Sequence, residues 1–197
     1  MEDAPAAADA RLLAASLKQL PEPELKPTFV VVSGLPGTGK SHFCRKLAER
    51  SPFAILESDA LRKTIFPSPA YTAEESARLF RAIHQLVEWL LEKGIPVILD
   101  ATNLSEQNRG RLYNIAERLE VRLILVNVMA PPELVQERLA SREAQKKPGD
   151  KSDADWVVYQ MMKPRVEKIN RKHYVVDTSQ NIAPVLDKIV REIRKGA

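Results

Sequence analysis

An eight-residue segment near the start of the chain combines the residue types and the spacing of a phosphate-binding loop. Residues 34–41 read Gly-Leu-Pro-Gly-Thr-Gly-Lys-Ser and satisfy the pattern G-x-x-x-x-G-K-[ST]. Glycines let the backbone turn tightly, so that successive N–H groups face phosphate oxygens. Lys40 is expected to reach the β- and γ-phosphates, and the Ser41 hydroxyl is expected to bind Mg²⁺. The segment therefore predicts a binding site for ATP and Mg²⁺.

We expect nucleotide contacts from this loop, from the residue after it and from the end of the last strand. That strand ends in Asp177-Thr178-Ser179, and the position of Thr178 favours a contact with the nucleoside. A strand-to-helix turn with a cap explains the same residues equally well. The predicted nucleotide contacts are Gly34, Pro36, Gly37, Thr38, Gly39, Lys40, Ser41, His42 and Thr178.

An acid and an arginine stand together where the second predicted strand ends. Asp59 precedes Arg62 by three residues at the start of a helical turn, which puts both side chains on one side of a crevice. Asp59 could accept the proton of an attacking hydroxyl, and Arg62 could hold an anionic acceptor or screen the transferred phosphoryl group. The alternative is that Asp59 caps the next helix and Arg62 is solvated.

The third predicted strand ends in four apolar residues followed by Asp100. This pattern resembles the Walker B strand and predicts that Asp100 lies near the metal and the phosphates. Thr102 and Asn103 follow as short hydrogen-bonding side chains at the strand end, and we expect them to contact the acceptor. The alternative for Asp100 is a helix N-cap, although Ser105 is the better candidate for that cap.

A lid is predicted after the fourth strand. Arg138 and Arg142 are four residues apart on one face of a helix, and a charged run at 143–151 follows them. Such a loop could close over the γ-phosphate, deliver positive charge and exclude water. The alternative is a solvated charge run on an ordinary helix. The next helix, which ends at Met162, carries aromatic residues and two methionines that we interpret as packing residues.

The elements that must position these side chains alternate along the chain. Short apolar runs alternate with segments of helical periodicity, and such near-continuous apolar strands predict a parallel sheet covered by helices on both faces. In an α/β sheet of this kind, ligands bind beyond the carboxyl ends of the strands, where the polar motifs fall. The predicted strands are residues 29–33, 53–57, 95–100, 121–129 and 173–177.

Composition favours a globular protein in a reducing compartment. The chain has 197 residues, a formal charge of +4 and no apolar stretch long enough to span a membrane, and its N-terminus does not resemble a secretory signal. Cys44 is the single cysteine, which excludes an internal disulfide and favours the cytoplasm. Leucines at helical spacing within residues 9–20 predict a short amphipathic helix, followed by a proline-rich linker; a poorly ordered extension is the alternative.

Taken together, these motifs resemble the P-loop kinases of the polynucleotide kinase, zeta-toxin and chloramphenicol phosphotransferase group, often described as AAA-type ATP-binding kinases. The resemblance covers roughly residues 28–190 and implies the sheet order 2-3-1-4-5. It also implies that Asp59 is the general base, that Arg62 binds the acceptor or a phosphate, and that Arg142 is the lid arginine supported by Arg138. The corresponding acceptor pocket would lie within residues 60–71, around Arg62, Lys63, Phe66 and Tyr71.

The expected organisation is therefore an extension at residues 1–27 and a kinase domain at 28–197 with its lid near 138–153. The expected activity is ATP- and Mg²⁺-dependent transfer of a phosphoryl group to a hydroxyl. A small molecule and a 5′-hydroxyl end of a polynucleotide both remain open as acceptors. An ATP-binding or ATP-hydrolysing regulatory module without a dedicated acceptor is the alternative.

Overall fold

Alternate residues of the first strand point into two different cores. In the computed structural model, which describes residues 7–17, 19–144 and 154–195, strand β1 (Thr28–Ser33) is buried along its whole length. Phe29 and Val31 belong to one apolar cluster, and Val30 and Val32 belong to another. Because neighbouring side chains of a strand leave opposite faces, β1 must lie in the centre of a sheet covered on both sides.

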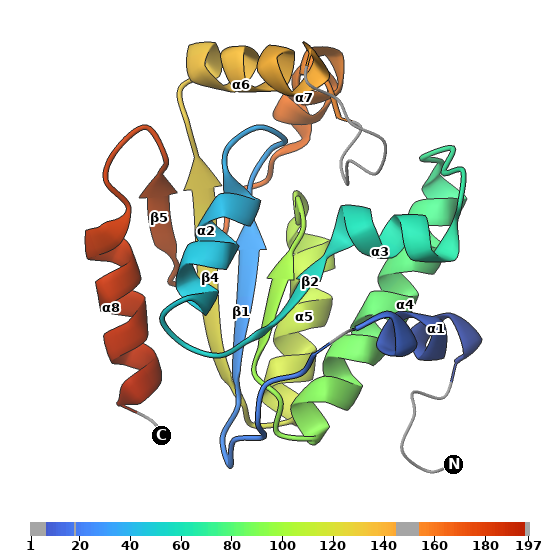
Figure 1. Cartoon of the computed structure of the whole chain (residues 1–197), viewed down its shortest axis with the longest axis vertical. Coiled ribbons are helices and arrows are strands. Elements are labelled where there is room, and N and C mark those ends of the chain that lie inside the picture. Colours follow the sequence, from blue (N-terminus) through green and yellow to red (C-terminus); the bar gives the residue numbers. More distant parts are fainter. Residues whose placement is uncertain (1–6, 18, 145–153, 196–197) are drawn as a thin grey trace.

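The sheet has five parallel strands among the described residues, in the order β2-β3-β1-β4-β5 (Figure 1). This confirms the predicted α/β class and the strand order implied by the resemblance. The predicted strands are also confirmed, with their starts shifted by one or two residues. Besides β1, the strands are β2 (Ala54–Glu57), β3 (Val97–Asp100), β4 (Arg122–Met129) and β5 (Tyr174–Asp177).

Helices cover both faces of this sheet and form three layers with it (Figure 1). Residues of α2 and α8 pack on one face, and residues of α1, α4 and α5 pack on the other. The helices are α1 (Ala8–Ser16), α2 (Lys40–Ala48), α3 (Ser58–Ile65), α4 (Ala73–Glu92), α5 (Glu106–Arg118), α6 (Pro132–Ala144), α7 (Trp156–Met162) with the short 3-10 helix η1 (Lys163–Arg165), and α8 (Ala183–Arg194).

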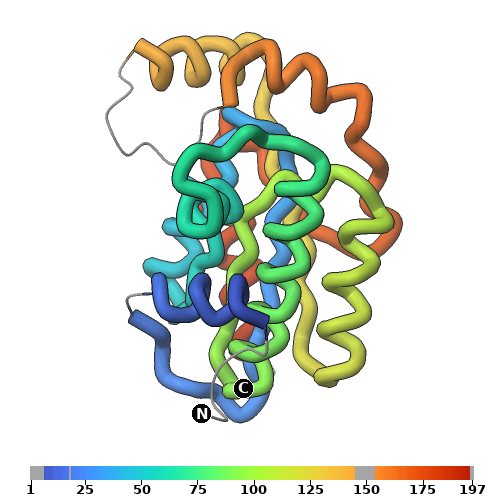
Figure 2. The backbone as a smooth tube through the Cα atoms, turned by 90° about the vertical axis from the view of Figure 1, so that its right-hand side faces the viewer, coloured from blue at the N-terminus to red at the C-terminus, as the bar shows by residue number. Residues whose placement is uncertain are grey.

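Helices α6 and α7 lie across the carboxyl edge of the sheet, above the ends of the strands (Figures 1 and 2). The register of the parallel strands aligns those ends. Asp100 at the end of β3 is opposite Glu57 on one neighbour and Val32 on the other. The predicted polar motifs therefore meet at one edge, beneath the two crossing helices.

The N-terminal helix packs on the domain, but it is shorter than predicted. Ala10 and Leu13 are buried, and Asp9 accepts two hydrogen bonds from Arg78 of α4 at 2.6 and 2.8 Å. The helix ends at Ser16, because Leu17 already has an extended backbone, so the leucine spacing overestimated its length. In the part of the chain that the structure describes, no helix is long and apolar enough to cross a membrane.

His84 of α4 is a largely buried titratable side chain beside Phe80, with their ring centroids 6.3 Å apart. Burial and the nearby charge of Arg111 lower the pKa of His84 to about 4. The unfolded chain therefore takes up a proton below about pH 6.5, whereas the folded chain does so only near pH 4. This difference makes the folded state less stable as the pH falls through that window.

We predict that the free energy of unfolding falls more steeply between pH 7 and pH 5 in the wild type than in His84→Gln. The expected difference is about 1–2 kcal/mol, allowing for the partial exposure of the ring. Urea denaturation of both proteins at the two pH values measures it. Equal pH dependence in the two proteins would show that His84 does not titrate in this way.

Candidate active site

The phosphate loop has a backbone shape that its glycines make possible. Gly37 has a φ of +77°, and a Cβ at this position would lie 2.9 Å from the side chain of Val135. At Gly34, a Cβ would lie 2.3 Å from the carbonyl oxygen of Val128. The loop thus turns tightly while α6 and the end of β4 press against it, and no larger residue fits at either position.

Two opposite charges, a half-buried lysine and a buried aspartate, lie where this loop meets β3. Lys40 opens α2, and its Nζ donates to the Leu35 carbonyl oxygen at 3.0 Å. Burial lowers the pKa of Lys40, while the carboxylates of Asp100 and Asp59 oppose this shift. Burial likewise raises the pKa of Asp100, and the Lys40 ammonium and a hydrogen bond with Ser41 oppose it. Lys40, Ser41 and Asp100 thus bring an ammonium, a hydroxyl and a carboxylate to one cavity.

Thr178 and Arg138 brace the other flank of the loop. The Thr178 hydroxyl donates to the Thr38 carbonyl oxygen at 2.7 Å. Arg138 donates to the Thr178 hydroxyl at 2.8 Å and to the Thr178 carbonyl oxygen at 3.1 Å. Arg138 is therefore held at the loop by residues far away in the sequence, and Thr178 lies against the loop backbone.

A cavity of about 690 Å³ opens above these residues. Its walls come from the phosphate loop, the ends of β2 and β3, α3, α4, α6 and the segment from Ala154 to Arg165. It brings together most of the side chains that the sequence singled out. The predicted site residues that line it are Pro36, Gly37, Gly39, Lys40, Ser41, His42, Asp59, Arg62, Asp100, Thr102, Arg138 and Arg142. Gly34, Thr38, Asn103 and Thr178 do not line it.

Asn103 requires a correction, because it does not reach the cavity as an acceptor contact. Its side chain is 4% exposed, and its amide donates to the Val32 carbonyl oxygen at 2.9 Å. Its backbone has a φ of +46°, a conformation that asparagine tolerates better than most residues. Asn103 therefore ties the loop after β3 to β1, whereas Thr102 beside it faces the cavity.

Arg62 is held firmly on the α3 side of the cavity. Its guanidinium donates to the Ser76 hydroxyl at 3.1 Å and stacks over the ring of Tyr71 at 5.1 Å. The carboxylate of Glu75 lies 3.7 Å from Nη1, too far for a hydrogen bond. Among the described residues, no group accepts a hydrogen bond from that buried Nη1 atom. The interpretation of Arg62 as a solvated residue is wrong, since only 8% of it is exposed.

The two helices above the cavity have a small core of their own. Val135 and Leu139 of α6 pack with Tyr159 of α7, and Leu35 of the phosphate loop packs against this cluster. Arg142, at the end of α6, donates to the Ala154 carbonyl oxygen. The predicted lid at 138–153 lies only partly within this description, because residues 145–153 are outside the described part of the chain.

One wall of the cavity was not predicted from the sequence. Met161 and Met162, which we interpreted as packing residues, line the cavity, and Met161 is 58% exposed. Phe80 and Arg165 also belong to the lining. The amphipathic pattern of a seven-residue helix resting on another helix does not distinguish a face that packs from a face that borders a cavity.

The two sides of the cavity differ in their chemistry. On one side, glycine backbone, Lys40 and a helix N-terminus suit the phosphates of a nucleotide. On the other side, Asp59 and Arg62 of α3 face an open volume bordered by apolar side chains of α4 and α7. The arrangement can hold a phosphorylated donor and a second molecule in one chamber.

Known proteins match this chain over much of its length. A family profile described as an AAA domain, AAA_33, matches residues 29–169. An L-seryl-tRNA(Sec) kinase from Methanococcus maripaludis is 32% identical over 119 residues, which cover 58% of this chain and 46% of that protein. An adenylyl-sulfate kinase from Myxococcus xanthus is 27% identical over 104 residues, which cover 51% of this chain and 56% of that protein. The chain thus spans about half the length of the curated relatives it matches.

Solved structures share the fold at lower identity. The APS kinase CysC of Mycobacterium tuberculosis, in complex with AMPPNP and APS, has a TM-score of 0.63 and 17% identity, covering 88% of this chain and 99% of that one. A chain of the Pnkp1/Rnl/Hen1 RNA repair complex has a TM-score of 0.55 and 22% identity, covering 73% of this chain and 47% of that one. With the family profile spanning most of the sheet, the chain belongs to the AAA_33 family of P-loop kinase domains.

Proposed function

We propose that the protein transfers the γ-phosphoryl group of ATP to an acceptor hydroxyl in a reaction that requires Mg²⁺. One observation carries this proposal: Lys40 and Asp100 share a cavity with Asp59 and Arg62. A module that only binds or hydrolyses ATP needs the first pair and has no need of an acid and an arginine across the chamber. The kinase relatives support the same reading.

In the donor half, the loop backbone and Lys40 would hold the phosphates. Ser41 and Asp100 supply a hydroxyl and a carboxylate to the same cavity, and such hard oxygen ligands fit Mg²⁺. When bound, the ion neutralises charge on the phosphate oxygens. The electrostatic surroundings fit as well, because the burial that raises the pKa of Asp100 favours a cation beside it.

In the acceptor half, Asp59 would align the attacking hydroxyl and take its proton. It lies in the first turn of α3, where the helix dipole favours a negative charge. Arg62 lines the cavity and would hold an anionic part of the acceptor, in addition to the Glu75 carboxylate that lies 3.7 Å from its Nη1 atom. Tyr71 and Ser76 keep the guanidinium in place for that contact.

The lid arginines would complete the charge around the transferred group. Arg138 is fixed at the phosphate loop through Thr178, and Arg142 reaches the cavity from the end of α6. Positive charge held in a water-excluding chamber stabilises the charge that develops on the phosphoryl oxygens. Closure of α6 and α7 over the cavity would exclude water from the reaction.

For the acceptor, we propose a hydroxyl compound that carries an anionic group. The names of the two relatives specify a seryl-tRNA and an adenylyl sulfate, one nucleic acid and one small molecule. Arg62 and Arg165, together with the apolar side chains beside them, suit either kind. A 5′-hydroxyl polynucleotide end and an anionic small alcohol are therefore the first acceptors to test.

We predict that Lys40→Met weakens the binding of Mg²⁺–AMPPNP by about 10–100-fold, because the ammonium that would hold the phosphates is lost. Isothermal titration calorimetry measures the affinity. Lys46→Met is the matched control, since Lys46 lies on the same helix but is exposed and pairs with Glu49. Wild-type affinity in Lys40→Met would show that Lys40 does not contribute to nucleotide binding.

We predict that Asp59→Asn slows phosphoryl transfer by about 10²–10⁴-fold while Mg²⁺–AMPPNP still binds, because the general base is lost. Transfer of radiolabelled γ-phosphate is measured to 5′-hydroxyl DNA and RNA oligonucleotides, nucleosides, sugars and other alcohols. Asp187→Asn is the matched control, as Asp187 is exposed and pairs with Arg50 outside the cavity.

The same assay distinguishes the kinase from the alternative module. Release of ADP that depends on an acceptor and is lost in Asp59→Asn supports the kinase. Hydrolysis that needs no acceptor and is unchanged in Asp59→Asn would instead support an ATP-hydrolysing regulatory module.

A further inference from the structure

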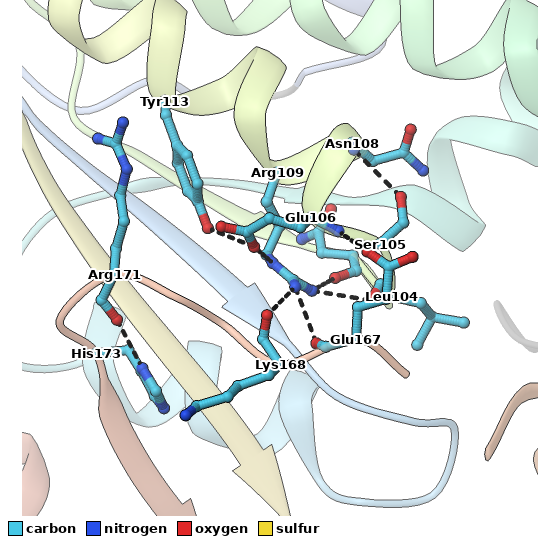
Figure 3. A network of polar contacts seen from close by, with 11 residues as sticks. Leu104, Ser105, Glu106, Asn108, Arg109, Tyr113, Glu167, Lys168, Arg171 and His173 are labelled. Atoms are coloured by element: carbon cyan, nitrogen blue, oxygen red, sulfur yellow. Dashed lines mark hydrogen bonds and ion pairs between the residues drawn. The ribbon is translucent and has the colours of Figure 1, made fainter. Parts of the chain in front are cut away.

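Arg109 of α5 is a charged side chain that is only 1% exposed and does not line the cavity. Nη1 donates to the carbonyl oxygens of Asn103 and Leu104 at 2.6 and 2.9 Å (Figure 3). Nη2 donates to those of Glu167 and Lys168, both at 2.9 Å. Nε donates to the Glu106 carboxylate at 2.8 Å. All five N–H groups of the guanidinium therefore have acceptors.

These contacts join two segments that lie far apart in the sequence. Residues 103–104 follow β3, and residues 167–168 follow η1 on the way to β5. Further bonds connect the same segments, because the Glu167 amide donates to the Leu104 carbonyl oxygen at 3.0 Å and the Glu167 carboxylate accepts from the Glu106 amide at 2.6 Å. We call this set of bonds around Arg109, Glu106 and Glu167 the Arg109 clamp.

The chain beyond the clamp stays attached to α5. Ile169 is buried in the larger core, and Arg171 lies over the ring of Tyr113 at 4.3 Å and pairs with Glu117. Figure 2 shows the chain after α7 descending alongside α5. The clamp is therefore the point at which the chain coming from the lid joins the body of the domain.

On its lid side, the clamp is adjacent to the cavity wall formed by Met161, Met162 and Arg165. Arg165 lies two residues before Glu167, and Met161 and Met162 end the helix just ahead of it. Helix α7 otherwise packs on α6 through Tyr159, in a cluster separate from the two cores of the sheet. The wall is thus attached to the body at two places, through α6 to the phosphate loop and through the clamp to α5.

On its other side, the clamp leads directly to the phosphate loop. The amide of Asn103 donates to the Val32 carbonyl oxygen at 2.9 Å, and the Thr102 carbonyl oxygen accepts from the Gly34 N–H at 3.2 Å. Thr102 itself lines the cavity. A short chain of hydrogen bonds therefore connects the first glycine of the phosphate loop to the base of the lid.

We propose that Arg109 is a positioning residue that sets the acceptor-side wall, Met161, Met162 and Arg165, at a fixed distance from the phosphate loop. A lysine cannot replace it, because one ammonium has three N–H groups and no planar fork for carbonyls on two sides. Buried carbonyl oxygens would then lack partners, and the segment after η1 would separate from α5. The kinetic part of the test rests on the proposed function, whereas the structural part does not.

The test compares Arg109→Lys with Arg118→Lys in the full chain. Arg118 lies on the same helix, but it is exposed and pairs with Glu88, which makes its substitution the matched control. Amide hydrogen exchange is followed by mass spectrometry, without ligand and with Mg²⁺–AMPPNP. In Arg109→Lys, we expect peptides within residues 156–168, which include the Glu167 amide, to exchange at least tenfold faster. Peptides of β1 and β4 should keep their wild-type rates.

Two exchange results would overturn the proposal. Wild-type rates at 156–168 would show that the clamp does not hold the wall. Equal acceleration in β1, β4 and 156–168 would make Arg109 a residue of general stability. If Arg109→Lys does not fold, Glu167→Ala removes the bond to the Glu106 amide alone. It should give a smaller acceleration confined to the same peptides, and wild-type rates in it would also contradict the clamp.

The kinetic readout uses the alcohol or oligonucleotide that accepts phosphate in the panel assay. Arg109→Lys should raise the KM for that acceptor at least fivefold and leave the KM for ATP within twofold of wild type. An equal rise in both, or in neither, would contradict a positioning role at the acceptor wall. If no compound accepts phosphate, the kinase proposal fails, and the exchange measurement still decides whether the clamp exists.

Discussion

The electrostatic attraction between Lys40 and Asp100 is the interaction on which the site depends. Either charge alone would be costly to remove from water, as the opposite pKa directions of the two groups show. Each charge lowers the free-energy cost of desolvating the other, and a hydrogen bond with Ser41 further favours the charged form of Asp100. The pairing of β1 with β3 sets Val32 opposite Asp100, so the sheet itself determines how the phosphate loop and the acid meet.

This constraint explains which features the sequence could predict. The strand-loop-helix pattern around Lys40 and the apolar run before Asp100 are local signals, and each fixes a side chain near a strand end. The parallel register then brings them together without further information from the sequence. The strand order could not be predicted in this way. Hydrophobic periodicity contains no information about which strands are neighbours, so the order was inferred from the resemblance to a family.

The failures have equally definite causes. Asn103 was expected at the acceptor because it follows a strand, yet its amide is used by a carbonyl oxygen of the neighbouring strand. Met161 and Met162 were expected in a core, but the helix that carries them rests on another helix and not on the sheet. Arg109 drew no attention at all, because its partners are backbone carbonyl oxygens, which no side-chain pattern reveals. In each case, the position of the side chain is determined by contacts between segments that are far apart in the sequence.

The first helix has a consequence for how the domain can be handled in the laboratory. The family profile starts at residue 29, whereas Leu13 of α1 fills a fully buried place in the larger core, and Arg78, which binds Asp9, also lies over the ring of Phe66. A protein trimmed to the profile would leave an apolar hollow on α4 beside the end of α3. Uncovered apolar surface of this kind drives self-association. The boundary of the family and the boundary of the folding unit therefore do not coincide in this chain.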